Sequence, residues 1–405
     1  MTEKKIRLLR IHYAAIESVY WIINAIFMVF IVPLLRNRGF DNGQIGILLA
    51  VRSFSCILLQ PIVASFADKH EETIPLKYII SAIVAVSLAT SLLFYEIHFG
   101  FWGSAVVFAF LGASITALTP LYTSLAMQYL SAGYDLKFSI ARGCGSISYA
   151  LCCIVLGYVV DYQGVEMTLI LQIAMLVISI IIIITFRTCP APKGGRKEYS
   201  KPNSTWHVLV NNRGYSFFLL ASVLLFVGNN MTTSFLVDVV TKLGGTNTDV
   251  GYCQFVLAAI EFPMALLFIR MKKRAGTLNI MRICAVFILI KIMGILLAPN
   301  IPVLIGVHAF QMLGAGLYWS GSVYYVNENV SGKDKIKGQS LMAIFSTGVG
   351  SGVGSLISGW VSQRYNIDVL VMTGAVCASF GVVIMFYAMK ISKISAANYA
   401  AVTVN

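Results

Sequence analysis

The chain has 405 residues, of which 58% are hydrophobic and only 12% are charged, and its formal net charge is +13. Its mean hydropathy of +0.80 and its small share of charged residues exclude an ordinary soluble domain, which averages about 25% charged residues. The basic excess alone would fit a nucleic-acid partner, but the positions of the basic residues give it another explanation.

Twelve apolar runs bounded by charged residues, glycine or proline follow one another along the chain. A helix needs about 20 apolar residues to cross a bilayer, so we predict an all-α membrane protein with twelve transmembrane helices. The first run is long and lacks a small-residue cleavage site, so we expect no cleavable signal peptide. The predicted spans are residues 11–35, 44–66, 75–95, 101–129, 139–160, 166–187, 215–240, 249–270, 279–298, 301–326, 338–360 and 367–390.

The basic residues are distributed unevenly between the two sides of these spans. If the N-terminus is cytoplasmic, most of the 30 lysines and arginines fall in cytoplasmic loops, and the outer loops hold only Arg36, Arg38, Lys242 and Arg364. This positive-inside distribution predicts that both termini are cytoplasmic. The excess charge therefore orients the protein in the bilayer, and we expect no nucleic-acid partner.

A polar segment rich in proline, glycine and lysine, residues 188–214, divides the spans into six and six. The halves echo each other, since Gly157 and Gly359, 202 residues apart, close the glycine-rich fifth and eleventh spans. An internal repeat of six helices is typical of transporters whose site lies near the membrane midplane between the halves. We predict two pseudo-symmetric six-helix bundles, residues 1–187 and 215–405, joined by a basic cytoplasmic linker.

The first span places Glu17, Tyr20, Trp21 and Asn24 at positions i, i+3, i+4 and i+7, which share one helix face. A carboxylate, two aromatic rings and an amide on one stripe suit a sugar or another polyol. The alternative is that Glu17 lies near the inner interface and the two aromatic residues belong to an interfacial belt.

Arg142 lies at the start of the fifth span or inside it, and an arginine at a helix centre costs roughly 2.5–3.5 kcal/mol. Small residues follow it, among them Gly143, Gly145 and Ser146, and they let neighbouring helices approach closely. We expect Arg142 to line a polar cavity in the first bundle. The alternative is an arginine at the cytoplasmic end that extends to the lipid headgroups.

The seventh span holds Asn229 and Asn230 among threonines and serines, followed by Asp238. This polarity predicts a cavity-lining or broken helix.

Glu261 in the eighth span and Lys291 in the ninth are candidates for function, or else for a structural ion pair.

His308 in the tenth span is a third ionisable candidate of the second half, although a lone buried histidine is commonly a satisfied core residue. Pro263 lies two residues after Glu261 in the eighth span. Because proline has no backbone N–H, the carbonyl group four residues earlier lacks its usual helical hydrogen bond.

The eight cysteines lie mostly inside spans, and none has metal-ligand spacing. We expect no metal, no cofactor and no disulfide framework. The sequence also lacks a nucleophile motif, a cluster of metal ligands and a phosphate-binding loop, so we do not expect an enzyme.

Three segments carry a resemblance to a known family: LLQPIVASFADK from Leu58, ARGCGSISYALC from Ala141, and VGY from Val250. They resemble the major facilitator superfamily, and within it the lactose permease-like oligosaccharide:proton symporters and the related nucleoside:proton symporters. The resemblance implies a monomeric multi-pass protein of the bacterial cytoplasmic membrane, with a small-molecule substrate and a proton or sodium ion as coupling ion. Asp68 and Lys69 would then form a conformational switch at the end of the second span.

Carried over residue by residue, the resemblance implies that Arg142 binds sugar hydroxyls, that Tyr149 packs on the sugar and that Ser146 lines the site. It also places Lys291 and His308 at basic positions of the ninth and tenth spans.

The sequence departs from the family at the carboxylates. Ser124 stands where the permeases have a fourth-span carboxylate, and Ala258 where they have one in the eighth span. Gln311 and Gly314 stand at the proton-carrying positions of the tenth span. The proton machinery of the family is therefore not reproduced, and galactoside specificity does not carry over.

We predict a secondary active transporter that moves a small polar solute, sugar-like or nucleoside, by alternating access with proton coupling. The alternatives are a drug or metabolite exporter and an uncoupled facilitator. The predicted substrate-binding residues are Arg142, Tyr149, Ser146, Tyr20, Trp21, Asn24, Ser124, Asn229, Asn230, Gln311 and Trp319, and the predicted coupling residues are Glu261, Lys291, His308, Glu17 and Asp238.

Overall fold

The computed structural model describes residues 3–70, 73–188, 204–330 and 334–404. Within these ranges all regular structure is helical, and eleven helices are long and apolar enough to cross a membrane. The all-α membrane class predicted from the sequence is therefore confirmed.

The helices gather into two compact units. Unit 1 comprises Met1–Arg196 and Gly244–Ala259, and unit 2 comprises Lys197–Leu243 and Ile260–Asn405. The predicted linker at residues 188–214 lies mostly outside the described residues, so the domain boundaries drawn from the sequence stay a prediction.

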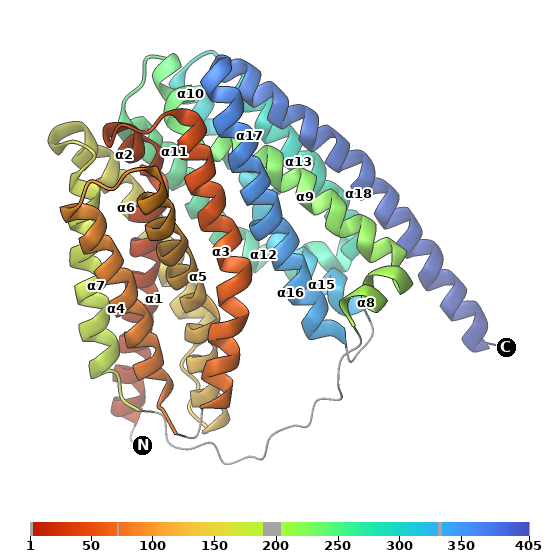
Figure 1. Cartoon of the computed structure of the whole chain (residues 1–405). Coiled ribbons are helices and arrows are strands. Elements are labelled where there is room, and N and C mark those ends of the chain that lie inside the picture. Colours follow the sequence, from red (N-terminus) through yellow and green to blue (C-terminus); the bar gives the residue numbers. More distant parts are fainter. Residues whose placement is uncertain (1–2, 71–72, 189–203, 331–333, 405) are drawn as a thin grey trace. The chain divides into compact units, whose positions relative to one another are not determined.

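The helices of unit 1 are drawn from red to green in Figure 1. They are α1 (Glu3–Val29), α2 (Ile31–Asn37), α3 (Asn42–Lys69), α4 (Leu76–Glu96), α5 (Phe101–Ser131), α6 (Phe138–Gln163), α7 (Met167–Thr185) and α11 (Asn247–Ala259). Within this unit α3 packs along α5, α6 packs along both α1 and α11, and α4 packs against α5 and α7. Because apolar residues occur all around most of these helices, each can face both a neighbouring helix and lipid.

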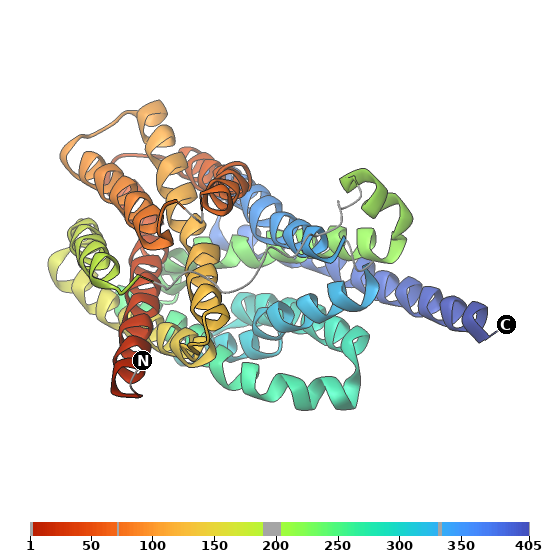
Figure 2. The same ribbon diagram turned by 90° about the horizontal axis from the view of Figure 1, so that it is seen from below.

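Unit 2 contains the remaining helical segments. They are α8 (Thr205–Asn211), α9 (Arg213–Ser234), α10 (Leu236–Lys242), α12 (Glu261–Ala275), α13 (Thr277–Leu297), α14 (Ile301–Val307), the 3-10 segment η1 (His308–Met312), α15 (Ala315–Asn329), α16 (Lys335–Ala343), the π-helical segment η3 (Ile344–Gly350), α17 (Ser351–Arg364) and α18 (Ile367–Val404). The central element is α9, which packs against α13, α17 and η3 and along the long helix α18. Figure 2 shows α18, in blue, extending past the end of α9 toward the C-terminus.

The eighth predicted span, residues 249–270, is not one helix. It breaks at Ile260 into α11 and α12, and neither half is long enough to count as a span, which accounts for eleven long helices where twelve were predicted. Pro263 has no amide hydrogen to donate to the carbonyl group of Ala259, so the helix cannot continue regularly through this point. The sequence predicted the weak point, but not that α11 would pack into unit 1 while α12 belongs to unit 2.

The contact between α6 and α11 depends on two glycines. A Cβ atom at Gly157 would lie 2.7 Å from the carbonyl oxygen of Asn247, and one at Gly251 would lie 2.5 Å from that of Cys153. Both distances are far shorter than van der Waals contact, so the two backbones approach this closely only because no side chain intervenes.

Asp161, near the end of α6, caps the first turn of α11. Its carboxylate accepts hydrogen bonds from the backbone amides of Asn247 and Thr248 at 3.0 and 2.8 Å. The side chains of the same two residues donate to it at 2.9 and 2.6 Å. Amides in the first turn of a helix lack partners within that helix, so a residue of α6 completes the start of α11.

We expect the Gly251→Ala substitution to lower the free energy of unfolding by about 1–3 kcal/mol, because the added methyl group forces two backbones apart. Unfolding of the purified protein in detergent would measure this. Gly306→Ala is the matched control, because a Cβ atom there meets no atom within 4 Å and alanine favours a helix by roughly 0.5–1 kcal/mol over glycine. Equal stability of the two variants would contradict the tight α6–α11 contact.

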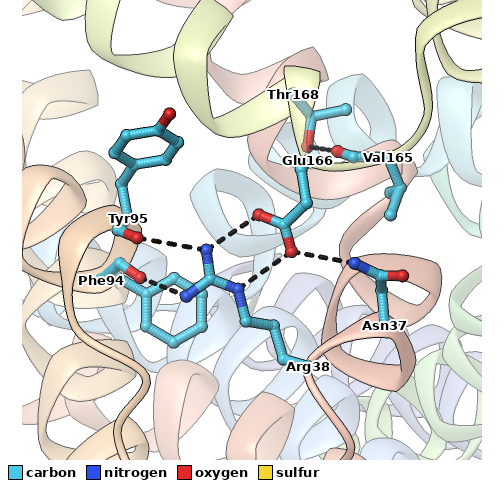
Figure 3. A network of polar contacts seen from close by, with 7 residues as sticks. All are labelled: Asn37, Arg38, Phe94, Tyr95, Val165, Glu166 and Thr168. Atoms are coloured by element: carbon cyan, nitrogen blue, oxygen red, sulfur yellow. Dashed lines mark hydrogen bonds and ion pairs between the residues drawn. The ribbon is translucent and has the colours of Figure 1, made fainter.

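A charged network joins three segments at one end of unit 1 (Figure 3). Arg38 donates to both oxygens of Glu166, at 3.0 and 2.8 Å. The same guanidinium donates to the carbonyl groups of Phe94 and Tyr95 at 2.6 and 3.4 Å, and Asn37 donates to Glu166 at 3.0 Å. The Arg38 side chain is only 5% exposed, so the network fastens the α2–α3 connection to the end of α4 and to the α6–α7 connection.

The network sets the ionisation of Glu166. Partial burial would raise the pKa of this carboxyl group, but the hydrogen bonds from Arg38 and Asn37 and the charge of Arg38 outweigh burial and hold the pKa below its usual value of 4.5. A carboxyl group with a lowered pKa stabilises the fold above its unfolded pKa, and this contribution is lost as the pH falls through the folded pKa.

We therefore expect the wild-type protein to unfold at a higher temperature than Glu166→Gln at neutral pH. This difference should begin to shrink as the pH falls below 4.5 and should be lost once the pH lies below the lowered pKa of the folded protein. Thermal scans in detergent across this pH range test the expectation. Glu96→Gln removes an exposed carboxyl group and should leave the pH dependence unchanged. A difference between wild type and Glu166→Gln that is constant at every pH would exclude the charged network as its cause.

Candidate functional site

The Arg142 cluster of unit 1 comprises Trp21 on α1 and Arg142, Ser146 and Tyr149 on α6. The guanidinium carbon of Arg142 lies 3.9 Å from the centre of the Trp21 ring, and Arg142 Nη1 donates to Ser146 Oγ at 3.1 Å. The ring of Tyr149 lies 6.2 Å from that of Trp21 in an edge-to-face arrangement. Three residues predicted from the fifth span therefore lie beside an aromatic residue predicted from the first.

Gly145 explains how Trp21 reaches this position. A Cβ atom at Gly145 would lie 2.4 Å from Trp21 Cδ1, so the indole ring occupies space that any other residue would fill. The tryptophan and Arg142 are both half-buried, and their guanidinium–indole contact is of the cation–π type, which stabilises a charge without neutralising it.

Glu17 and Tyr20 are buried more deeply than Trp21, although all three come from the predicted stripe and the rings of Tyr20 and Trp21 lie 5.4 Å apart. Glu17 is 2% exposed and accepts a hydrogen bond from Tyr13 Oη at 2.9 Å. Tyr20 is 3% exposed, and its hydroxyl group bonds Thr119 on α5. The stripe is thus divided between the core of unit 1 and a more accessible face.

Two other predicted residues of unit 1 lie apart from the cluster's contacts. Asn24 is half-buried and donates to the carbonyl group of Tyr20 at 2.9 Å. Ser124 on α5 is exposed, so the serine that stands at the family's carboxylate position does not act as a buried partner for Arg142.

The Lys291 cluster of unit 2 comprises Asn229 on α9, Glu261 on α12, Lys291 on α13 and Gln311 on η1. Lys291 is 2% exposed, and its Nζ donates to Asn229 Oδ1 at 2.6 Å and to Gln311 Oε1 at 2.7 Å. Gln311 Nε2 donates in turn to Glu261 Oε1 at 3.4 Å. The amide group of Gln311 therefore connects the buried ammonium to the carboxylate. Whether Glu261 and Lys291 act in function or only in structure stays a prediction.

The other predicted residues of unit 2 have structural contacts of their own. Asn230 Oδ1 accepts from Ser355 on α17 at 3.1 Å, and Trp319 packs its ring 5.2 Å from that of Phe226. His308 is 2% exposed, and its Nδ1 donates to the carbonyl group of Leu304 at 2.8 Å. This contact matches the alternative that His308 is a satisfied core residue.

The remaining predictions lie at the edges of the helices. Asp238 is half-buried on α10, and Lys69 is exposed at the end of α3. The side chain of Asp68 lies outside the described residues, so the predicted switch stays a prediction. Among the described residues, no group of three or more histidine, cysteine, aspartate or glutamate side chains could hold a metal ion.

The sequence did not single out Tyr13, which completes the surroundings of Glu17 together with Tyr122. Tyr13 Oη also meets the carbonyl oxygen of Tyr122 at 3.0 Å, and the Tyr122 ring lies 5.1 Å from that of Tyr20. The spacing of Tyr13 and Glu17, four residues on one helix, was the signal that could have identified the first contact.

Apolar helices that are long enough to cross a membrane and hold buried charges are typical of multi-pass membrane proteins with a functional polar site. The chain matches the model of the MFS_1 like family over residues 12–371 and belongs to that family, so it is a secondary transporter of the major facilitator type. The family assignment confirms the resemblance seen in the sequence and gives no support to an enzyme.

The chain is similar to the maltose permease of Geobacillus stearothermophilus, with 19% identity over 376 residues that cover 92% of each protein. Its structure is similar to that of the nucleoside transporter NupG, with a TM-score of 0.79, 15% identity and coverage of 94% of this chain and 98% of that one. A bacterial homolog to the human lysosomal transporter Spinster, inward-facing and unoccupied, gives a TM-score of 0.66 at 12% identity, with coverage of 98% and 97%. Both structural likenesses show the fold.

We expect Arg142→Lys to lower transport at least about tenfold, because an ammonium lacks the planar group that covers the indole ring of Trp21 while donating to Ser146. Uptake of a transported solute into proteoliposomes measures this. Arg270→Lys, at an exposed arginine, is the matched control and should transport normally. Wild-type uptake by Arg142→Lys would exclude the cluster from the transport pathway.

Proposed function

We propose that the protein is a proton-coupled symporter for a small hydroxylated solute, a sugar or a nucleoside. The observation that carries the proposal is the Arg142 cluster, where an indole ring, a guanidinium, a hydroxyl group and a phenol lie together on α1 and α6. Aromatic rings cover the apolar face of a sugar or base, and a few polar groups fix its orientation. The similarity to a maltose permease supports a substrate of this kind.

The Lys291 cluster is our candidate for proton coupling. A carboxylate in direct contact with an ammonium holds its negative charge firmly, whereas one that is reached through a neutral amide is easier to protonate. Gln311 provides this amide between Lys291 and Glu261. A proton on Glu261 would remove a charge at membrane depth and so lower the barrier to a change of conformation.

The charge pattern supports an orientation in the membrane, because positive-inside loops favour cytoplasmic positions for both termini. We propose the cytoplasmic membrane of a bacterium as the location of the protein. We also propose that it works as a monomer. A proton is the proposed coupling ion, with sodium as the alternative.

Uptake of labelled disaccharides, monosaccharides and nucleosides into proteoliposomes, with and without an inward proton gradient, tests the function. Gradient-stimulated uptake of one solute would support the symporter and identify its substrate class. Uptake that ignores both proton and sodium gradients would make the protein a facilitator. If no solute enters, the gradient should be reversed with amphiphilic dyes as cargo, and their export would replace the proposal with an exporter.

We expect Glu261→Gln to abolish accumulation against a gradient but to retain equilibration of the solute across the membrane, because the glutamine stays neutral throughout the cycle. The ratio of internal to external solute at steady state measures this. Glu96→Gln, at an exposed glutamate, should accumulate solute as the wild type does. Accumulation by Glu261→Gln would rule out this carboxylate as the coupling group.

A further inference from the structure

Arg52 is a charged residue inside α3 that neither cluster uses. Its Nη1 donates to the sulfur of Met28, and its guanidinium carbon lies 5.6 Å from the centre of the Phe27 ring. A thioether is a weak hydrogen-bond acceptor, so most of the five donors of this guanidinium remain available. Within the described part of the chain, no carboxylate forms an ion pair with Arg52.

The position of Arg52 extends the Arg142 cluster along one face. Met28 lies seven residues beyond Trp21 on α1, and Tyr149 lies seven residues beyond Arg142 on α6. Seven residues make about two helical turns, or on the order of 10 Å. Trp21 contacts Arg142 at one end, Met28 contacts Arg52 at the other, and Arg52 lies within electrostatic reach of Tyr149.

This strip of α1 is partly accessible, and some of the residues between its members are buried. Trp21 and Asn24 are half-buried and Met28 is 42% exposed, whereas Ile23 and Ala25 are fully buried. The strip therefore presents an indole ring, an amide and a thioether to the same side, with one guanidinium at each end.

Gly112 on α5 positions the side chain of Arg52. A Cβ atom at Gly112 would lie 2.3 Å from Arg52 Cγ and 2.8 Å from the Arg52 carbonyl oxygen. The stem of the arginine thus occupies the space above the glycine, which directs its charged end toward α1.

We propose that this strip binds an anionic solute, with Arg52 holding its carboxylate or phosphate group and the Trp21–Arg142 end holding its hydroxylated part. The inference rests on the proposed function and narrows its substrate class to acidic or phosphorylated relatives of sugars and nucleosides. Glu17 interacts electrostatically with Arg142, whereas among the described residues no ion pair with a carboxylate is seen for Arg52. A charge at membrane depth requires a partner. A guanidinium binds carboxylate and phosphate oxygens through two parallel hydrogen bonds, so an oxyanion supplies that partner.

Pairs of a neutral solute and its anionic derivative provide the test. Maltose and maltobionate form the carboxylate arm, and uridine and uridine 5′-monophosphate form the phosphate arm. Binding to the purified protein and uptake into proteoliposomes are measured for all four solutes. We expect the anionic member of one pair to bind at least about tenfold more tightly than its neutral partner.

Substitutions of Arg52 test whether this residue causes the preference for the anionic solute. Arg52→Gln should reduce affinity for the anionic member at least about tenfold more than for the neutral one, and Arg52→Lys should restore part of the preference. Gly112→Ala should weaken the preference by displacing the arginine. Arg270→Gln removes an exposed positive charge elsewhere and should leave the ratio of affinities unchanged.

The outcomes separate this inference from the function on which it rests. Transport of maltose or uridine with no preference for either anionic partner would overturn the anionic substrate and leave the sugar or nucleoside symporter standing. An equal loss for both members of a pair in Arg52→Gln would assign Arg52 a structural role and overturn the proposal. If the protein neither binds nor transports any of the four solutes, the inference and the proposed function fail together.

Discussion

The partly buried charges of the two units impose the constraint on which the rest of the structure depends. A charged side chain at membrane depth is unfavourable by several kcal/mol unless groups around it replace water. Here the replacements in the clusters are rings, hydroxyl groups and amides: Trp21 covers Arg142, and Gln311 with Asn229 surrounds Lys291. Such neutral partners replace part of the water that a charged side chain loses at membrane depth.

Glycines decide where these side chains are placed. Hydrophobic attraction does little to bring helices together inside a bilayer, so close packing of small residues takes its place. In unit 1 glycines also leave space for side chains of the candidate site: Gly145 for the ring of Trp21 and Gly112 for the aliphatic stem of Arg52. The fold and the candidate site therefore share one cause, and a methyl group at either glycine would disturb both.

The sequence predicted the helical membrane class because apolar runs of this length have no other stable arrangement in a bilayer. The resemblance to the family grouped Arg142, Ser146 and Tyr149, which lie on one helix. The sequence failed where a tertiary contact decides, since α1 alternates between core and accessible positions according to what α5 and α6 present. The amide bridge of Gln311 between Lys291 and Glu261 also lay beyond prediction, because it joins residues of three segments through side-chain geometry.

The cap that Asp161 provides for α11 has a consequence for the role of water. Asp161 is exposed and accepts four hydrogen bonds from the start of α11. If the two helices separate, water can take over each of these bonds, since both partners lie at helix ends. When this contact opens, the first residues of α11 exchange their hydrogen bonds to the Asp161 carboxylate for hydrogen bonds to water, and the carboxylate becomes hydrated. Its equilibrium depends on the activity of water, and an osmolyte that is excluded from the protein surface favours the closed contact.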